Sequence, residues 1–250
     1  MTKTKSGLIF GIHPVHEAIK SGKPIDKVLL KHGLKNEIIP GLFSTLREMK
    51  IPYQYVPVEK LNRITAKNHQ GIIALTSEVE YTDLEKLIPL LFEQAKLPAV
   101  VLLDGITDVR NLGAIARSAE CAGFDALIIP AKGSAQINSD AIKTSAGALN
   151  NIPVCRVTTL SDAAIYLHDS GFQLIAATEK ADEFIFTADF TRPLAVILGA
   201  EDTGIDPKLL RMADKLVKIP MYGSIQSLNV SAAATVFFYE MVRQRNFQKD

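Results

Sequence analysis

The pattern of hydrophobic and polar residues changes character near residue 98. Before that point, short amphipathic stretches alternate with short apolar ones, which predicts alternating helices and strands. After it, the apolar runs show no polar alternation, as expected of strands that are covered on both faces. These runs are AVVLLDGI, ALIIP, VCRVT, FQLIAAT, LAVILGA and KLVKIP, and helical stretches separate them.

This alternation predicts an α/β domain with a mostly parallel sheet over residues 98–250. A small α/β domain over residues 1–80 precedes it. Between them, residues 81–97 are expected to form an amphipathic linker helix that prolines interrupt or end. Within the first domain we expect helices at 14–22, 36–50 and 58–65 and strands at 27–30, 52–57 and 71–79, with Pro40 and Gly41 delaying the second helix.

The composition is that of an ordinary globular protein, with 47% hydrophobic and 22% charged residues among 250. No apolar run approaches the roughly 20 residues that span a bilayer, and MTKTKSGLIFG lacks a signal-peptide pattern. Cys121 and Cys155 show neither metal-site nor disulfide spacing. We therefore expect a cytoplasmic protein.

Charge is distributed unevenly, although the net charge is only +1. Residues 1–80 hold 12 Lys and Arg against 7 Asp and Glu, and residues 81–250 hold 16 against 20. A basic first domain is typical of contact with a polyanion. Ordinary variation would give the same imbalance, so charge alone leaves both interpretations open.

Several common catalytic patterns are absent from the sequence. No strand leads into GxGxxG, and neither a GxxxxGK[ST] phosphate loop nor a GxSxG elbow occurs. His13 and His16 stand three apart, but no further candidate ligand lies near them in sequence. We therefore expect no metal.

The first candidate site is LLDGITDVRNLGAIARSAECAG, residues 102–123. Either Asp108 or Asn111 could cap the helix that follows. Arg117 lies inside this small, apolar helix, where a charge requires a partner, either a ligand or an ion pair on the surface. If Asn111 lies in the turn before the helix, it could reach the same ligand as Arg117.

The second and third candidate sites also follow predicted strands, at the sheet edge where open α/β sheets bind ligands. In LAVILGAEDTGI, Gly199 could let a ligand approach the backbone, and Glu201 could pin its turn by accepting backbone N–H bonds. In IPMYGSIQSLNVSAAATVFFYE, Met221–Ile225 would form a loop before Ser227 and Asn229. Capping of the apolar helix explains one of these small polar residues, and a bound ligand would explain the others.

These three stretches resemble, in order and spacing, the motifs of the SpoU family of SPOUT RNA 2′-O-methyltransferases. The matching segments are NLGAIAR, LGAEDTG and IPMYGSIQSLNVSAAA, and residues 7–79 resemble the small RNA-binding domain that precedes catalysis in many members. FGIHPVHEAI, HQGIIA and GSAQINSDAIKTSAGAL are most similar to members that methylate a guanosine in the peptidyl-transferase loop of 23S rRNA. DVRN departs from the more frequent DPHN and leaves Arg110 as an extra cation.

The resemblance implies a deep C-terminal trefoil knot, S-adenosyl-L-methionine as methyl donor, RNA as substrate, and a homodimer with its sites at the subunit interface. Backbone groups near Gly199, Ile219 and Leu228 would hold the adenosine, with Leu198 and Met221 beside them. Ser227 and Asn229 would face the reacting end of the cofactor.

Arg117 matches the arginine to which accounts of the family give the proton of the ribose hydroxyl. A guanidinium has a pKa above about 12 and is seldom deprotonated. We therefore favour a role in which Arg117 clamps the substrate phosphate and stabilises the developing alkoxide. Asn111, Glu201, Ser227 and Asn229 would then orient the hydroxyl and the turns around it.

Two alternatives to this function remain. The substrate could be a tRNA ribose or another rRNA nucleotide, or the protein could be a non-catalytic RNA-binding factor of ribosome assembly. A pure binder would have no use for the trio Arg117, Glu201 and Asn229, which favours an enzyme.

Overall fold

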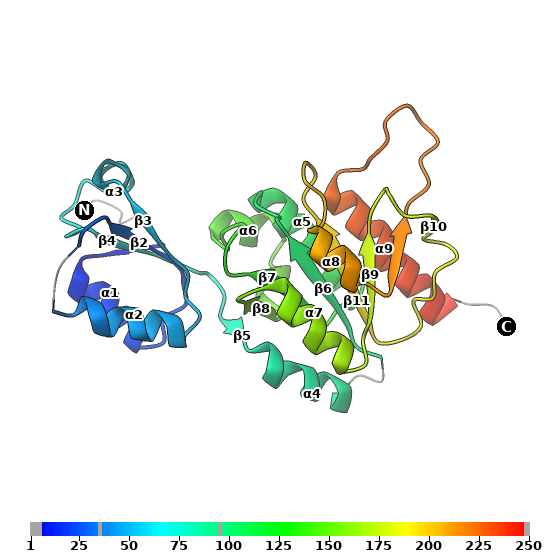
Figure 1. Cartoon of the computed structure of the whole chain (residues 1–250), viewed down its shortest axis with the longest axis horizontal. Coiled ribbons are helices and arrows are strands. Elements are labelled where there is room, and N and C mark those ends of the chain that lie inside the picture. The colour runs from blue at the N-terminus through cyan, green and yellow to red at the C-terminus, as the bar shows by residue number, and fades with distance from the viewer. Residues whose placement is uncertain (1–6, 35–36, 95–96, 248–250) are drawn as a thin grey trace. The chain divides into compact units, whose positions relative to one another are not determined.

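The computed structural model describes residues 7–34, 37–94 and 97–247. The chain divides into two compact units (Figure 1). The first runs to Glu80 and includes Gln136–Asn138, and the second holds the remainder from Tyr81 onward. No helix in the described ranges has the length and apolar character that a membrane span requires.

The first unit is a four-stranded sheet in the order β1-β4-β2-β3. Its strands are β1 (Leu8–Phe10), β2 (Ile25–Lys31), β3 (Tyr53–Val56) and β4 (Ile72–Thr76). β2 and β3 pair in parallel, whereas β4 pairs with β1 and β2 in antiparallel fashion. β3, which pairs only with β2 among the described strands, is therefore an edge strand of this sheet.

Helices cover both faces of this small sheet. α1 (Ile12–Lys20) and α2 (Ile39–Glu48) pack on one face against residues such as Val28 and Leu30 of β2. α3 (Val58–Ile64) packs on the other face, where Leu29 points, because successive strand residues alternate between faces. α2 begins at Ile39, later than the start of the predicted helical stretch, and Pro40 lies in its first turn, a position that tolerates proline.

The second unit is an eight-stranded sheet in the order β10-β12-β9-β11-β6-β7-β8-β5, and all of its pairings are parallel. Its strands are β5 (Tyr81–Thr82), β6 (Ala99–Asp104), β7 (Ala126–Pro130), β8 (Val154–Val157), β9 (Gln173–Ala177), β10 (Glu183–Phe184), β11 (Leu194–Gly199) and β12 (Lys215–Lys218). The expected α/β fold with a mostly parallel sheet, preceded by a small α/β domain, is confirmed. The trefoil knot stays a prediction.

Two groups of helices sandwich the large sheet. One face carries α4 (Leu84–Gln94), α7 (Leu160–Asp169) and α8 (Pro207–Met212), whose apolar residues share a core with the strands (Figure 1). α5 (Val109–Cys121) packs against α9 (Val230–Phe247), and α9 contacts β11. The short α6 (Ser139–Thr144) and the 3₁₀ turn Ala148–Asn150 lie beside α5.

Residues 81–94, which we expected to belong to a linker, are part of the second unit. β5 pairs with β8 at the edge of the sheet. Leu84, Ile88 and Leu91 of α4 are buried in the shared core, because their spacing places them on one helical face. Pro89 lies inside α4 without ending it.

The order in which strands are added to the sheet reverses at β6. β7 and β8 are added on one side of β6, after which the chain returns to place β9 and then β11 on the other side. The end of β11 lies beside the end of β6, with Gly199 paired to Asp104. Such a switch point is where open parallel sheets bind ligands.

Candidate active site

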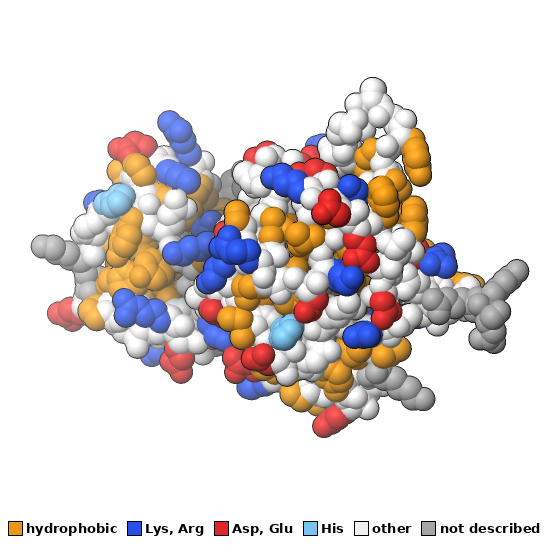
Figure 2. All heavy atoms as spheres, turned by 45° about the vertical axis from the view of Figure 1, so that its right-hand side comes forward, with side chains coloured by type: hydrophobic (Ala, Val, Ile, Leu, Met, Phe, Trp, Pro, Cys, Tyr) orange, Lys and Arg blue, Asp and Glu red, His pale blue; other side chains and the backbone are white. Residues whose placement is uncertain are grey.

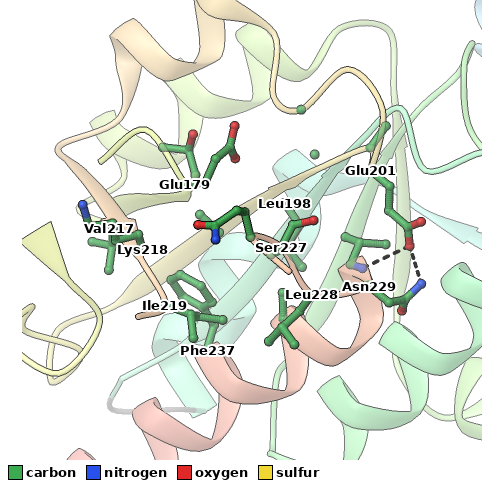
Figure 3. A pocket seen from close by; sticks show the side chains of 18 of the residues that line it. Glu179, Leu198, Glu201, Val217, Lys218, Ile219, Ser227, Leu228, Asn229 and Phe237 are labelled. Carbon is green, nitrogen blue, oxygen red and sulfur yellow. Dashed lines mark hydrogen bonds between the residues drawn. The ribbon is translucent and has the colours of Figure 1, made fainter. Parts of the chain in front are cut away.

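A cavity of about 280 Å³ opens at the carboxyl edge of the large sheet (Figure 3). Its walls come from the ends of β9, β11 and β12, the segment after β12, and the first turns of α9. The structure places all seven residues expected to contact a cofactor along this cavity: Leu198, Gly199, Ile219, Met221, Ser227, Leu228 and Asn229. Segments that are far apart in the sequence thus line one cavity.

Glu201 lies at one end of the cavity and joins all three motifs (Figure 3). Its Oε1 accepts hydrogen bonds from Asn111 Nδ2 at 3.2 Å, from the backbone N–H of Val230 at 3.2 Å, and from Asn229 Nδ2. Asn229 Nδ2 also lies 3.0 Å from Asn111 Oδ1. We call Asn111, Glu201 and Asn229 the polar cluster.

The carboxylate of Glu201 accepts a backbone N–H bond, as the sequence suggested. The donor is Val230, the first residue of α9. A carboxylate at a helix N-terminus is favoured by the helix dipole and by the free N–H groups there. The turn itself closes through a bond from Gly204 N to Ala200 O at 2.8 Å.

Asn111 reaches the polar cluster from the first turn of α5. Asp108 caps this helix, because its Oδ1 accepts from the N–H groups of Arg110 at 2.6 Å and Asn111 at 3.2 Å. The sequence had offered Asp108 and Asn111 equally as caps. With Asp108 in that role, the amide of Asn111 is available to the polar cluster.

The small polar residues before α9 have separate roles. Asn229 Oδ1 accepts from Ser231 N at 3.0 Å and from Ser231 Oγ at 2.5 Å, so it caps the helix locally while its amide group binds Glu201. Ser227 is exposed, lines the cavity and makes no hydrogen bond to the described residues. Capping therefore accounts for Asn229 and Ser231 and does not account for Ser227; its contact with a ligand stays a prediction.

Gly199 is required by the chain itself. A Cβ at this position would lie 2.3 Å from Gly204 C and 2.4 Å from Ile205 N, distances that real Cβ atoms essentially never show. We had expected the glycine to admit a ligand. The close approach that the structure shows is that of the backbone at residues 204–205; Gly199 also lines the cavity, and the approach of a ligand there stays a prediction.

Arg117 stands apart from the polar cluster. It is exposed on α5, and no ion pair or hydrogen bond joins it to the described residues. It is six residues from Asn111, which on an α-helix corresponds to roughly 240° around the axis. The surface ion pair that the sequence left open is therefore not formed, and one chain alone does not bring Arg117 to the cavity.

Asp104 ties the end of β6 to the start of α8. Its Oδ2 accepts the N–H of Asp206 at 2.7 Å, and Asp206 in turn caps α8 by accepting from Lys208 N. Burial raises the pKa of Asp104; the bond from Asp206 opposes this shift, and the negative charge of Asp206 adds to it. The carboxylate thus links the end of β6 to the start of α8, although burial disfavours its charged form.

Sequence reasoning missed several residues that line the cavity. Thr178 and Glu179 follow β9, Lys218 ends β12, and Phe237 reaches in from the second turn of α9. Glu179 lies at the end of the cavity opposite Glu201 (Figure 3). The rule that ligands bind where parallel strands end would have found Thr178 and Glu179, because FQLIAAT reads as a buried strand.

Comparison with protein families matches both units of the chain. Residues 98–239 match the model of the SpoU rRNA Methylase family. Residues 8–82 match the model described as RNA 2′-O ribose methyltransferase substrate binding. The two matches divide the chain near the boundary between the compact units.

Similar proteins extend over nearly the whole chain. A protein of Staphylococcus aureus (strain MSSA476) described as belonging to the TrmH family of tRNA/rRNA methyltransferases is 37% identical over 242 residues, which are 96% of each chain. A protein of Staphylococcus haemolyticus (strain JCSC1435) with the same description is 36% identical over 241 residues, again 96% of each.

Solved structures show the same fold. The SpoU methyltransferase AviRb of Streptomyces viridochromogenes, crystallised with AdoMet, has 26% identity and a TM-score of 0.60, covering 95% of this chain and 90% of its own. A TrmH/SpoU tRNA modifying enzyme of A. aeolicus has 30% identity and a TM-score of 0.56, covering 64% of this chain and 83% of its own. The chain belongs to the SpoU methylase family and is an RNA 2′-O-ribose methyltransferase with an N-terminal substrate-binding domain.

Proposed function

We propose that the protein transfers a methyl group from S-adenosyl-L-methionine to a ribose 2′-hydroxyl, and that its substrate is a guanosine in the peptidyl-transferase loop of 23S rRNA. The observation that carries the reaction is the polar cluster of Asn111, Glu201 and Asn229 at one end of the cavity. The identity of the nucleotide rests on the resemblance of FGIHPVHEAI, HQGIIA and GSAQINSDAIKTSAGAL to members with that target.

The cavity suits an adenosine-containing cofactor. Its apolar walls, from Leu198, Ile219, Leu228 and Phe237, can sandwich a purine, while the exposed backbone after β12 offers N–H and C=O groups to its edge. Its volume of about 280 Å³ is close to the lower end of ligand pockets. AviRb has been crystallised with AdoMet, and its fold is shared by this chain. When bound, the cofactor supplies an electrophilic methyl group.

The chain's own residues would supply alignment. The polar cluster fixes the start of α9 against the turn after β11, so Ser227 and Asn229 are held beside the end of the cavity. Alignment of donor and acceptor can lower a barrier by roughly 7–11 kcal/mol in favourable intramolecular models. The acceptor hydroxyl is a weak acid, and a nearby guanidinium would stabilise the charge that develops on its oxygen.

We infer that this guanidinium comes from a second copy of the chain, so that the active protein is a homodimer. Arg117 is exposed and lies away from the cavity of its own chain, with no partner among the described residues. A two-fold dimer would let Arg117 of the partner subunit complete the cavity. It would there bind the substrate phosphate through its planar fork.

Mapping ribose methylation tests the reaction and the target together. In cells lacking the protein, one guanosine of the peptidyl-transferase loop should lose its 2′-O-methyl group, and the wild-type gene but not the Asn229→Ala variant should restore it. Loss at a tRNA ribose or another rRNA position would keep the reaction and correct the target. No change at any ribose would favour a non-catalytic assembly factor and overturn the proposal.

Mixing two inactive variants tests the composite site. Arg117→Ala and Asn229→Ala should each be inactive as homodimers. In a mixed dimer, one site would combine the intact cavity of one chain with the intact arginine of the other, so an equimolar mixture should recover about a quarter of wild-type turnover. If both residues act within one chain, every site stays defective and mixing recovers nothing.

Two further features of the proposal follow from its chemistry. No metal is needed, so cofactor binding measured by calorimetry should be the same with and without a chelator. Within the described residues, no group of three or more His, Cys, Asp or Glu side chains could hold a metal ion.

An enzyme of ribosomal RNA acts where ribosomes are assembled, and we accordingly place it in the cytoplasm.

A further inference from the structure

Four aromatic rings gather at the free edge of the small sheet in the N-terminal unit. Tyr53 and Tyr55 project to the same side of the outermost strand β3. Phe43 of α2 packs on Tyr53 with ring centroids 5.0 Å apart, and Tyr55 meets Tyr53 edge to face at 6.2 Å. His32, just after β2, stacks on Tyr55 at 5.6 Å with 24° between the rings. We call these four residues the ring cluster.

Burial explains only half of the ring cluster. Phe43 and Tyr53 are partly buried and pack against the core of the unit. Tyr55 is 45% exposed, and His32 is exposed as well. These two rings therefore form a nearly parallel stack in water, where a further flat ring could be added. Figure 2 shows hydrophobic side chains at the surface of this unit, with a histidine and Lys or Arg side chains nearby.

A basic hollow is lined by Lys31, which directly precedes the ring-cluster residue His32 in the sequence. The side chain of Lys31 points to the other side of the sheet, into this hollow of about 410 Å³, which Asn62, Lys67 and His69 also line. Asn62 Oδ1 and His69 Nε2 are 2.8 Å apart, which restrains both side chains. The hollow thus presents two ammonium groups and amide groups on the opposite face of the sheet, one residue along the chain from His32.

We propose that the ring cluster and this hollow form a docking surface for single-stranded RNA. An unpaired base would stack on His32 and Tyr55, and the strand would pass around the end of β2 so that phosphates further along it reach Lys31 and Lys67 on the opposite face. Bases stack on aromatic side chains irrespective of sequence, and lysines neutralise phosphates. The inference rests on the proposed function, because it assigns a contact to the RNA substrate of that enzyme.

The surface should discriminate loops from duplexes. In a duplex the base faces are covered by neighbouring base pairs, so a stacking platform gains nothing from them. The alternative occupant of an edge strand is a second copy of the chain. Residues 1–80 carry a formal charge of +5 from their Lys, Arg, Asp and Glu, which opposes pairing of this unit with itself and favours a polyanion.

Binding of a hairpin RNA with an unpaired loop, compared with a duplex of the same stem, tests the platform in the full-length protein. Tyr55→Ala should weaken hairpin binding roughly 5- to 150-fold and leave duplex binding unchanged, whereas Tyr55→Phe keeps the ring and should bind normally. Lys31→Ala should weaken both RNAs and lower the salt slope by about 1. Met49→Ala is the matched control, since Met49 is 41% exposed on the same unit and outside the ring cluster.

A fluorescent reporter gives an independent readout. The chain contains no Trp, so emission from Tyr55→Trp would come from this position alone, and Met49→Trp serves as its control. The hairpin should quench the first reporter and not the second, while the duplex should quench neither. Emission that stays unchanged at saturating hairpin would overturn the inference.

Other outcomes separate this inference from the proposed function. If wild-type protein methylates RNA but Tyr55→Ala binds the hairpin normally, only the docking surface is wrong. If Tyr55→Ala instead abolishes self-association measured by sedimentation, the rings belong to a contact between copies, and the inference is again overturned. Failure of wild-type protein to methylate any RNA would contradict the proposed function while hairpin binding still reports on the surface.

Discussion

At the scale of single residues, a side chain's partners in the fold decide its role more than its neighbours in sequence do. Glu201 follows a strand inside a short turn, yet its carboxylate binds Asn111, Asn229 and the first N–H of α9. Arg117 follows Asn111 by one and two-thirds turns of helix and binds none of the described residues. The first residue joins three segments of one chain, and the second is exposed without a partner among the described residues.

Substitution of Arg117 tests whether it clamps a phosphate or accepts a proton. As a clamp that stabilises charge in the transition state, its removal in Arg117→Ala should lower kcat by roughly 10²–10³. Arg117→Lys keeps the charge but loses the planar fork, so it should recover only a small part. Cofactor affinity should stay unchanged in both, since Arg117 does not line the cavity.

The pH dependence of the Arg117→Lys variant separates the two roles. A clamp does not titrate, so the pH–rate profile should keep the shape of the wild type. A lysine acting as base would instead gain activity with rising pH and approach wild type in alkaline buffer. Rates measured at saturating cofactor from neutral to alkaline pH decide between them, and such a gain would restore the base.

Asp104 and Glu240 should affect stability with opposite signs. Burial raises the pKa of Asp104, so its charged form costs stability at neutral pH. Burial also acts to raise the pKa of Glu240, but bonds from Arg243 and Gln244 outweigh it and leave that pKa lowered. Asp104→Asn should therefore stabilise the protein at pH 7, and Glu240→Gln should destabilise it.

Both effects should fade in acid. The gain of Asp104→Asn is fully present above the raised pKa, shrinks as pH falls towards the ordinary value of 3.8, and disappears below it, where both states of the wild type are protonated. The loss in Glu240→Gln begins to fade below the ordinary value of 4.5 and vanishes as pH falls through the lowered pKa. Urea unfolding at several pH values measures this, and equal signs for the two variants would contradict it.

At the scale of elements, the end of β11 lies in close contact with the backbone of the turn that follows it. Gly199 leaves no room for a side chain beneath the backbone of residues 204–205. The turn between them carries Glu201, whose bonds reach α5 and α9. The position of the polar cluster therefore depends on a crossing that only glycine permits.

Gly199→Ala should accordingly impair folding. Its Cβ would collide with backbone atoms rather than a mobile side chain, so the cost should exceed the roughly 1–3 kcal/mol of ordinary overpacking. Gly223→Ala is the matched control, because nothing lies within 4 Å of a Cβ there, and it should change stability by less than about 1 kcal/mol. Thermal unfolding measures both, and equal midpoints would show that the crossing relaxes.

Much of this architecture could be predicted from the sequence, because long buried strands and amphipathic helices have distinct periods. The six apolar runs after residue 98 all became strands of the large sheet. β1, β5 and β10 were missed, since two or three residues are too few to show a period. The bond from Glu201 to the start of α9 was missed as well, because no periodicity reports which loops meet at a switch point.

At the scale of the whole molecule, the two units differ in charge. The first unit is basic, carries the ring cluster and matches a substrate-binding domain. The second is acidic on balance and holds the cavity and the polar cluster. A unit with a net negative charge repels the RNA backbone. We therefore expect most of the affinity for RNA to come from the first unit.

Deletion of residues 1–80 tests this division. The remaining chain, which includes β5 and α4, should bind S-adenosyl-L-methionine as the full protein does, because every residue of the cavity is retained. Its affinity for rRNA should fall, and the salt dependence of binding should weaken with the loss of cationic contacts. Calorimetry and filter binding at several salt concentrations measure these effects. An unchanged RNA affinity would contradict the assignment.

The pairing of β6 with β11 also has a kinetic consequence for the chain as it is synthesised. Ala99 lies opposite Leu194 in the sheet, so β6 is synthesised well before β11, the strand that pairs with one of its edges. At about 5–20 residues per second the delay is roughly 5–20 s. During that interval β7 can pair with one edge of β6 and β8 with β7, while the N–H and C=O groups of the other edge of β6 stay open to unrelated nascent chains. Slower translation should lengthen this exposure, and occupancy by a chaperone between the emergence of β6 and β11 should shield it.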